Sequence, residues 1–146
     1  RENFVPAASK SFAYMDRSVA VSGSRQLMAP AAFAQMLVAL RPQKRKRFQI
    51  LEAASGYAAA VLEAMGLQAT KGTADIIIID GAVDEIPADL LTILGDNGRI
   101  GGALRQGRVT RLFVAYKTDN QLTIDIVKDV DVPIISTMSK AEAFSF

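Results

Sequence analysis

Four consecutive isoleucines, Ile76 to Ile79, limit the fold of this chain more than any other feature of its sequence. A strand with one face in water alternates apolar and polar residues, whereas a strand buried on both faces is a continuous apolar run. β-Branched side chains also favour strands. The segment Ala74–Asp80 is therefore predicted to be a strand in the middle of a parallel sheet, and Asp80 and Gly81 are predicted to close it.

The residues before this run predict a helix, a strand and a second helix. After Pro30, a residue tolerated at a helix start, apolar residues recur at three- and four-residue spacing until Pro42. A strand is predicted from Arg47 to Ala53, and the alanine-rich segment from Tyr57 to Gly66 is predicted to be a helix. The apolar stripe of the first helix consists of Phe33, Met36, Leu37 and Leu40.

The residues after the isoleucine run predict one more helix and then strands joined by short turns. The helix begins at about Pro87, ends before Gly95 and has on one face Ile86, Leu90, Leu91 and Leu94. Short turns between the strands indicate antiparallel pairing. We therefore predict an α/β fold in which a doubly wound, mostly parallel sheet ends in an antiparallel hairpin, within a single domain of residues 1–146. The predicted strands are Arg99–Leu104, Val109–Lys117 and Leu122–Val130.

The connection between Gly66 and Ala74 is too short for this fold. Each parallel βα step needs about 30 residues. Either Leu67–Thr70 is not a core strand, or a stretch of the natural protein is absent from this sequence.

The composition excludes several chemistries. The chain has 146 residues with no cysteine and no histidine, so zinc hydrolases and Ser-His-Asp hydrolases are excluded. A formal net charge of +2 gives little support for a nucleic-acid partner. We see no export signal and no apolar stretch near the roughly 20 residues of a membrane-spanning helix. We therefore expect a soluble, cytoplasmic protein without a membrane partner or a metal site.

Several segments, in order along the chain, carry a resemblance to a known family. The amino-terminal block Arg1–Pro6 is similar to the motif "PREnFVP", and Ile50–Ala60 is similar to the cofactor motif "vLEiGtGsGYqaA". The segment Ala74–Pro87 is similar to "yDrIivtaav.eiP", and Gly23–Leu40 and Ala13–Asp16 also match. With these segments the chain resembles the protein-L-isoaspartate O-methyltransferases, repair enzymes with a Rossmann-like class I methyltransferase fold.

This resemblance implies a function and a division of the chain. It implies methyl transfer from S-adenosylmethionine to the free carboxylate of isoaspartyl residues in damaged proteins, which is a protein modification that serves protein repair. It also implies a substrate-side segment 1–45 and a cofactor-binding sheet 46–146 that lacks a family segment near residues 70–71. The implied cofactor-binding residues are Glu52, Ala53, Ala54, Ser55, Gly56 and Tyr57. The implied substrate-binding residues are Gln26, Leu27, Met28, Pro30, Gly81 and Ala82.

Two departures from the family pattern leave alternatives open. Met28 stands where the family has a Ser or Thr that contacts the reacting carboxyl, so no catalytic residue is assigned, although Ser22, Ser24 or Gln26 could replace that hydroxyl. Ala53-Ala54 makes the cofactor loop shorter and poorer in glycine. The chain could therefore be a binding protein that has lost catalysis, or a methyltransferase for another acceptor. Asp80 could face a ligand or cap a turn, and the basic run from Lys44 to Arg47 is expected to be a solvated turn.

Overall fold

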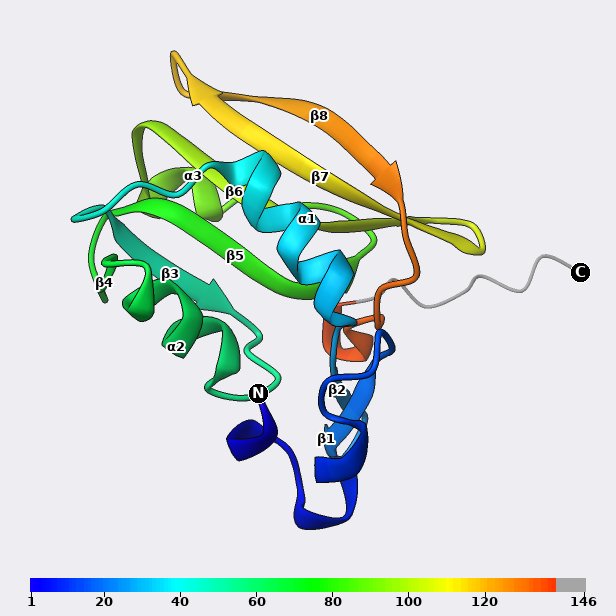
Figure 1. Ribbon diagram of the computed structural model, residues 1–146. Coiled ribbons are helices and arrows are strands. Elements are labelled where there is room, and N and C mark those ends of the chain that lie inside the picture. The colour runs from blue at the N-terminus through cyan, green and yellow to red at the C-terminus, as the bar shows by residue number, and fades with distance from the viewer. Residues whose placement is uncertain (139–146) are drawn as a thin grey trace, which may run out of the picture.

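The structure is a computed structural model that describes residues 1–138. Its centre is a six-stranded sheet in the order β4-β3-β5-β6-β7-β8 (Figure 1). The first four strands in that order are parallel, and β7 and β8 are antiparallel to their neighbours. The strands are β3 (Arg47–Leu51), β4 (Gln68–Ala69), β5 (Ala74–Val83), β6 (Leu94–Gln106), β7 (Val109–Thr118) and β8 (Gln121–Asp129). The predicted α/β class, with a mostly parallel sheet and an antiparallel end, is confirmed.

The isoleucine run lies in β5, at the centre of the parallel part of the sheet. Ile76 and Ile78 belong to a hydrophobic cluster with helices α1 (Pro30–Leu40) and α2 (Tyr57–Ala64) on one face. Ile77 and Ile79 belong to a second cluster with the short helix α3 (Leu90–Ile93) on the other face. All four side chains are at most 4% exposed, so the prediction of a strand covered on both faces is confirmed.

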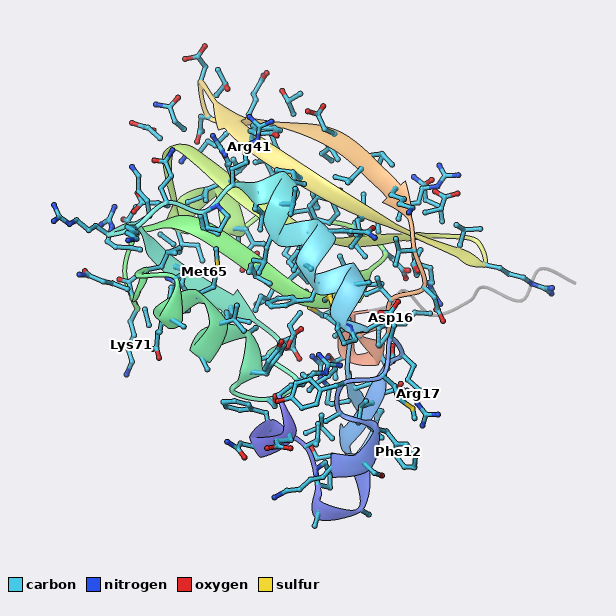
Figure 2. All side chains as sticks on the ribbon, viewed as in Figure 1. Phe12, Asp16, Arg17, Arg41, Met65 and Lys71 are labelled. Carbon is cyan, nitrogen blue, oxygen red and sulfur yellow. The ribbon has the colours of Figure 1, made fainter. Side chains whose placement is uncertain are left out.

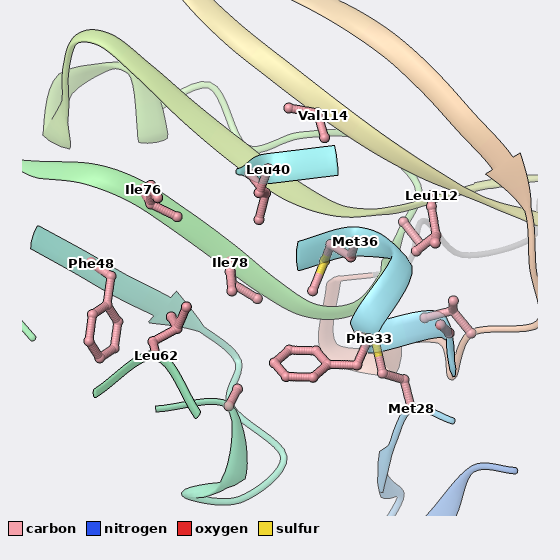
Figure 3. Packing of buried hydrophobic residues seen from close by; sticks show 14 of the residues in the cluster. Met28, Phe33, Met36, Leu40, Phe48, Leu62, Ile76, Ile78, Leu112 and Val114 are labelled. Atoms are coloured by element: carbon pink, nitrogen blue, oxygen red, sulfur yellow. The ribbon is translucent and has the colours of Figure 1, made fainter. Parts of the chain in front are cut away.

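Helix α1 forms over the predicted residues. It begins at Pro30 and ends at Leu40, where Arg41 adopts a left-handed conformation with φ of 50° just before Pro42. Phe33, Met36 and Leu40 are buried and point from α1 into the cluster that contains Ile76 and Ile78 (Figure 3).

The helix predicted from Pro87 is much shorter than expected. Only Leu90–Ile93 is helical, and Leu94 already begins β6, where it pairs with Ala74. Lys117 of β7 explains the early end, because its Nζ donates hydrogen bonds to the carbonyl oxygens of Leu91, at 2.8 Å, and Leu94, at 2.6 Å. This ammonium satisfies carbonyls that a longer helix would have bonded internally.

Strand β5 is longer than predicted. The prediction that Asp80 and Gly81 close it is wrong, because the strand continues to Val83 and Ala82 pairs with Ala103. The pairing with β6 is irregular between Ile78 and Ala82, and the added residues lie at the carboxyl end of the parallel strands.

The short connection between Gly66 and Ala74 contains only a two-residue strand, β4, at the edge of the sheet. Strand β4 has two residues, both exposed, so Leu67–Thr70 is not a core strand. Strands β4 and β5 lie on opposite sides of β3, and residues 70–73 must therefore cross β3. The side-chain amide of Gln49 on β3 donates a hydrogen bond of 2.5 Å to the carbonyl oxygen of Gly72 in this crossing.

The amino-terminal residues form a small unit at one end of the sheet (Figure 1). It contains the 3₁₀ helices η1 (Glu2–Phe4) and η2 (Ala7–Phe12) and the antiparallel pair β1 (Val19–Ser22) and β2 (Arg25–Leu27). Its hydrophobic cluster includes Val5, Val19, Leu27 and, from the loop after β3, Ala54. On its outer side the Arg17 guanidinium lies over the Phe12 ring at 5.0 Å (Figure 2). Within residues 1–138 no helix has the length and apolar character needed to cross a membrane.

Candidate functional site

The loop after β3 and the end of β5 meet at one edge of the sheet. Leu51 pairs with Ile79, so Glu52 and Asp80 follow at the same level of two adjacent parallel strands. The backbone N–H of Ala54 donates a hydrogen bond of 2.8 Å to Oδ2 of Asp80. Ligands of open α/β sheets bind at the carboxyl ends of the strands, which is where this loop lies.

Asp80 is a buried carboxyl with a perturbed proton affinity. Its residue is 3% exposed, and this burial raises its pKa above the ordinary value because a charge is poorly solvated there. The Ala54 N–H and the positive charges of Arg25 and Arg1 act in the opposite direction but do not cancel the effect. The sequence predicts that Asp80 either faces a ligand or caps a turn. In the structure its carboxyl accepts the N–H of Ala54 and so fixes the loop after β3.

Arg25 connects the amino-terminal unit to the same edge. Its Nη2 donates to the carbonyl oxygen of Glu52 and, at 3.3 Å, to that of Asp80. Glu52 has a φ of 54°, a left-handed conformation that is uncommon outside glycine and tends to occur at functional sites. The loop is thus held in an unusual conformation by contacts from β2 and from β5.

Aromatic rings and a guanidinium surround Tyr57 at the end of this loop. The Tyr57 ring lies 5.8 Å from the Phe4 ring and 5.6 Å from the Phe33 ring, measured between centroids. The Arg1 guanidinium lies 5.1 Å from the centroid of Tyr57, and Nη2 of Arg1 donates a 2.8 Å hydrogen bond to the carbonyl oxygen of Met28. Nε and Nη1 of Arg1 are buried and have no hydrogen-bond partner among residues 1–138.

The structure brings the predicted cofactor-binding residues together. Glu52, Ala53 and Gly56 are exposed along one continuous loop, Ser55 and Tyr57 are half-buried, and Ala54 is buried. The Ser55 hydroxyl accepts the N–H of Tyr57 at 3.2 Å, which organises the start of α2. A Cβ on Gly56 would lie 3.4 Å from the Phe4 ring, so the loop is in close contact with the amino-terminal unit.

The predicted substrate-binding residues are placed differently. Gln26 is exposed and Pro30 half-buried, but Leu27 and Met28 are 2% and 3% exposed and their side chains belong to hydrophobic clusters. Gly81 and Ala82 are buried beneath the chain that follows β8. The N–H of Ala82 donates to the carbonyl oxygen of Pro133, and a Cβ on Gly81 would lie 2.6 Å from Cγ1 of Ile135. Met28 contributes only its carbonyl oxygen to the site, where it accepts the hydrogen bond from Nη2 of Arg1.

Sequence reasoning missed three contributors to this site. Arg1 and Arg25 lie in two of the segments that carry the family resemblance, Arg1–Pro6 and Gly23–Leu40, and this membership is the only signal in the sequence that could have identified them. Thr137 could not have been found, because its hydroxyl reaches Oε2 of Glu52, at 3.5 Å, across 85 residues of sequence. Among the described residues no group of acidic side chains could hold a metal ion.

Several cavities of the described residues lie away from this loop. One of about 250 Å³ is lined by Lys46, Asp75 and Asp96 near the starts of the parallel strands, at the opposite edge of the sheet. Another, a groove of about 800 Å³, lies between α1 and the hairpin of β7 and β8.

Residues 1–72 of the chain match the family model described as protein-L-isoaspartate(D-aspartate) O-methyltransferase (PCMT). The predicted resemblance to this family is confirmed. The match includes the amino-terminal unit, α1 and the loop 52–57, and it ends in the crossing between β4 and β5. No curated protein matches this chain.

Solved structures of isoaspartate methyltransferases have the same fold. One protein-L-isoaspartate O-methyltransferase superimposes with a TM-score of 0.76 over 93% of this chain at 17% identity. A second structure, described as a PCMT from Plasmodium falciparum in complex with S-adenosyl-L-homocysteine, gives a TM-score of 0.62 over 82% of this chain at 14% identity. At these identities the similarity shows the fold alone. The chain spans 58% of the first of these proteins and 79% of the second.

Proposed function

We propose that this chain is part of an S-adenosylmethionine-dependent carboxyl O-methyltransferase with a doubly wound class I fold. The observation that carries the proposal is the loop 52–57, which lies within the family match and is fixed at the carboxyl edge of the sheet by Asp80. The proposed acceptor is the free carboxylate of isoaspartyl residues in damaged proteins, and the proposed setting is protein repair in the cytoplasm.

The residues at the edge suit the proposed cofactor. S-adenosylmethionine carries an amino group, a carboxylate and ribose hydroxyls, and when bound it supplies an electrophilic methyl group on a sulfonium. The exposed carboxylate of Glu52 would accept hydrogen bonds from the amino or hydroxyl groups. Ala53 and Gly56 are exposed, and Gly56, which has no Cβ, lets a ligand approach the main chain closely.

Arg1 fits an anionic group at the boundary between this loop and the amino-terminal unit. Burial of Nε and Nη1 without a hydrogen-bond partner among the described residues is unfavourable, by about 1–3 kcal/mol for an unsatisfied group and more for a charged one. A carboxylate that displaced part of the aromatic cluster around Tyr57 would accept a charge-assisted hydrogen bond from one of these two donors, which point to different sides of the guanidinium. We propose that Arg1 orients the acceptor carboxylate in this way.

The proposed reaction requires no proton transfer from this chain. A carboxyl group with a pKa near 4 is already ionised at neutral pH, so it attacks the methyl group without a general base. The work of the protein is to hold the carboxylate in line with the methyl group and to keep water out. A chain without histidine can perform this task.

A second function is favoured by the substrate side of the site. Gly81 and Ala82 are covered by residues 133–135, and the position of the family hydroxyl is taken by Met28, whose side chain is buried. A family member that binds the cofactor without catalysis would have these features. Binding and transfer must therefore be measured separately.

Titration calorimetry with S-adenosylhomocysteine tests the cofactor site. We expect binding to the wild type and weaker binding to Glu52→Ala, because Glu52 is exposed on the loop. Glu63→Ala, which removes an exposed carboxylate from α2, is the matched control and should bind as the wild type does. Absence of binding at millimolar ligand would refute the cofactor proposal.

Transfer of radiolabelled methyl groups to an isoaspartyl peptide tests the activity. Transfer to this peptide, with none to the matching aspartyl peptide, is the result expected for a repair enzyme. Binding of S-adenosylhomocysteine without transfer would instead support the binding protein.

A further inference from the structure

Strand β8 is a long edge of the sheet that residues 1–138 leave uncovered. It ends the strand order, and along its nine residues only Leu122 is partly buried (Figure 1). Ile124 and Ile126 are 44% and 47% exposed on the face that also carries Leu122. Natural edge strands are usually short, charged or covered, because a bare apolar edge invites another strand. The opposite edge, β4, is short in this sense.

The turn before β8 determines which backbone groups point outward. Asp119 and Asn120 both have positive φ, 49° and 61°, as in the type I′ turn of a two-residue hairpin. In such a hairpin the flanking pair, Thr118 and Gln121, is hydrogen-bonded, and bonded pairs then alternate along the ladder. The N–H and C=O groups of the residues at the non-bonded positions face away from β7. These outward-facing residues are Leu122, Ile124 and Ile126.

We propose that β8 pairs antiparallel with β8 of a second copy of this chain. The two-fold axis passes beside Ile124, so that Ile124 faces Ile124 of the second copy and Leu122 faces Ile126. All of these residues have outward-facing backbone groups, so the pairing can form without breaking any bond to β7. Their side chains form one apolar stripe across the junction, and the two sheets become one.

The charge of Asp125 favours this register over the one in which Ile124 lies opposite Ile126. In the proposed register Thr123 lies opposite Asp125 of the second copy, twice by symmetry, and a hydroxyl can donate to each carboxylate. A shift that places Ile124 opposite Ile126 brings Asp125 directly opposite Asp125, and like charges at that spacing are unfavourable. The irregular pairing of β8 with Leu112 and Phe113 limits the regular segment at its other end.

Sedimentation velocity over a range of concentrations tests the proposal. We expect the wild type to form a dimer, and Thr123→Glu to weaken it by about tenfold, since each of the two Thr123–Asp125 pairs becomes a pair of like charges. Thr118→Glu places the same charge on β7, away from the edge, and should dimerise as the wild type does. In the double variant Thr123→Glu/Asp125→Lys, opposite charges face each other and the dimer should return.

An engineered cross-link tests the axis itself. The chain has no cysteine, so Ile124→Cys provides a single thiol. Residues in a hydrogen-bonded antiparallel pair have Cα atoms about 5.5 Å apart, within the range that a disulfide spans. We expect oxidation to give a covalent dimer of Ile124→Cys and none of Val109→Cys, an exposed position on β7. A wild type that stays monomeric at all concentrations, or a dimer unaffected by Thr123→Glu, would overturn the proposal.

Discussion

The hydrogen bond between Asp80 and Ala54 makes a measurable prediction about how the loop is held. In Asp80→Ala, the buried N–H of Ala54 loses its acceptor, and an unsatisfied buried group costs about 1–3 kcal/mol. In Asp80→Asn, the side-chain carbonyl still accepts this bond. We therefore expect Asp80→Ala to be less stable than Asp80→Asn by about 1–3 kcal/mol, which is about 2–12 °C in Tm for a chain of this size.

The pH dependence of the same variants separates the charge from the hydrogen bond. The pKa of Asp80 is raised above its ordinary value of 3.8 by burial, so the folded state binds the proton more tightly than the unfolded state does. The wild type therefore loses stability as the pH rises from below 3.8 through the raised pKa, and then levels off. Asp80→Asn has no such proton, so its stability relative to the wild type should improve across this window.

Urea unfolding at a series of pH values, followed by circular dichroism, measures both effects. Equal stabilities of Asp80→Ala and Asp80→Asn at neutral pH would refute the role of the Ala54 hydrogen bond. A difference between wild type and Asp80→Asn that does not change with pH would refute the buried charge. Titration with S-adenosylhomocysteine adds a functional readout, because a loop released from Asp80 should bind it more weakly.

Three further changes test the core, the substrate side and an exposed ion pair. Ile78→Ala should cost about 2–5 kcal/mol in urea unfolding, since Ile78 is fully buried, whereas Val38→Ala at a position 75% exposed on α1 should stay within about 0.5 kcal/mol; similar losses would contradict the assigned burial. Met28→Ser should lower Tm without adding methyl transfer, because its side chain lies in the core, and a gain of transfer would show that it reaches the acceptor. Asp75→Asn should reduce stability slightly at neutral pH, because the Arg47 side chain, hydrogen-bonded to Asp75 at 3.2 Å, lowers the pKa of that carboxyl. This effect should vanish as the pH falls through the lowered pKa, and its persistence in strong acid would exclude the ion pair.

The parts of the fold that could be predicted depend on local patterns. The isoleucine run identified the central strand because continuous apolar sequence is rare outside elements buried on both faces. Pro30 and Pro42 bounded α1 because proline is tolerated at a helix start and is unfavourable within the helix. The loop 52–57 was placed by its position between a strand and a helix.

The errors involve contacts between residues far apart in sequence. The ammonium that ends α3 comes from Lys117, 26 residues after Leu91. Residues 133–135 cover Gly81 and Ala82 from more than 50 positions away, so neither periodicity nor a family motif could show that these two positions are buried. The motif gave the place of Met28 in the chain but not the direction of its side chain.

The guanidinium of Arg25 has a consequence for how a ligand could enter. One side chain of β2 holds the carbonyl oxygens of both Glu52 and Asp80, so the small amino-terminal sheet and the loop share a common anchor. If β2 moves, the loop loses the hydrogen bond from Arg25. If the loop opens, it must either break this hydrogen bond or move together with β2. These two segments, which the sequence separates by more than twenty residues, are therefore expected to move together when the loop opens.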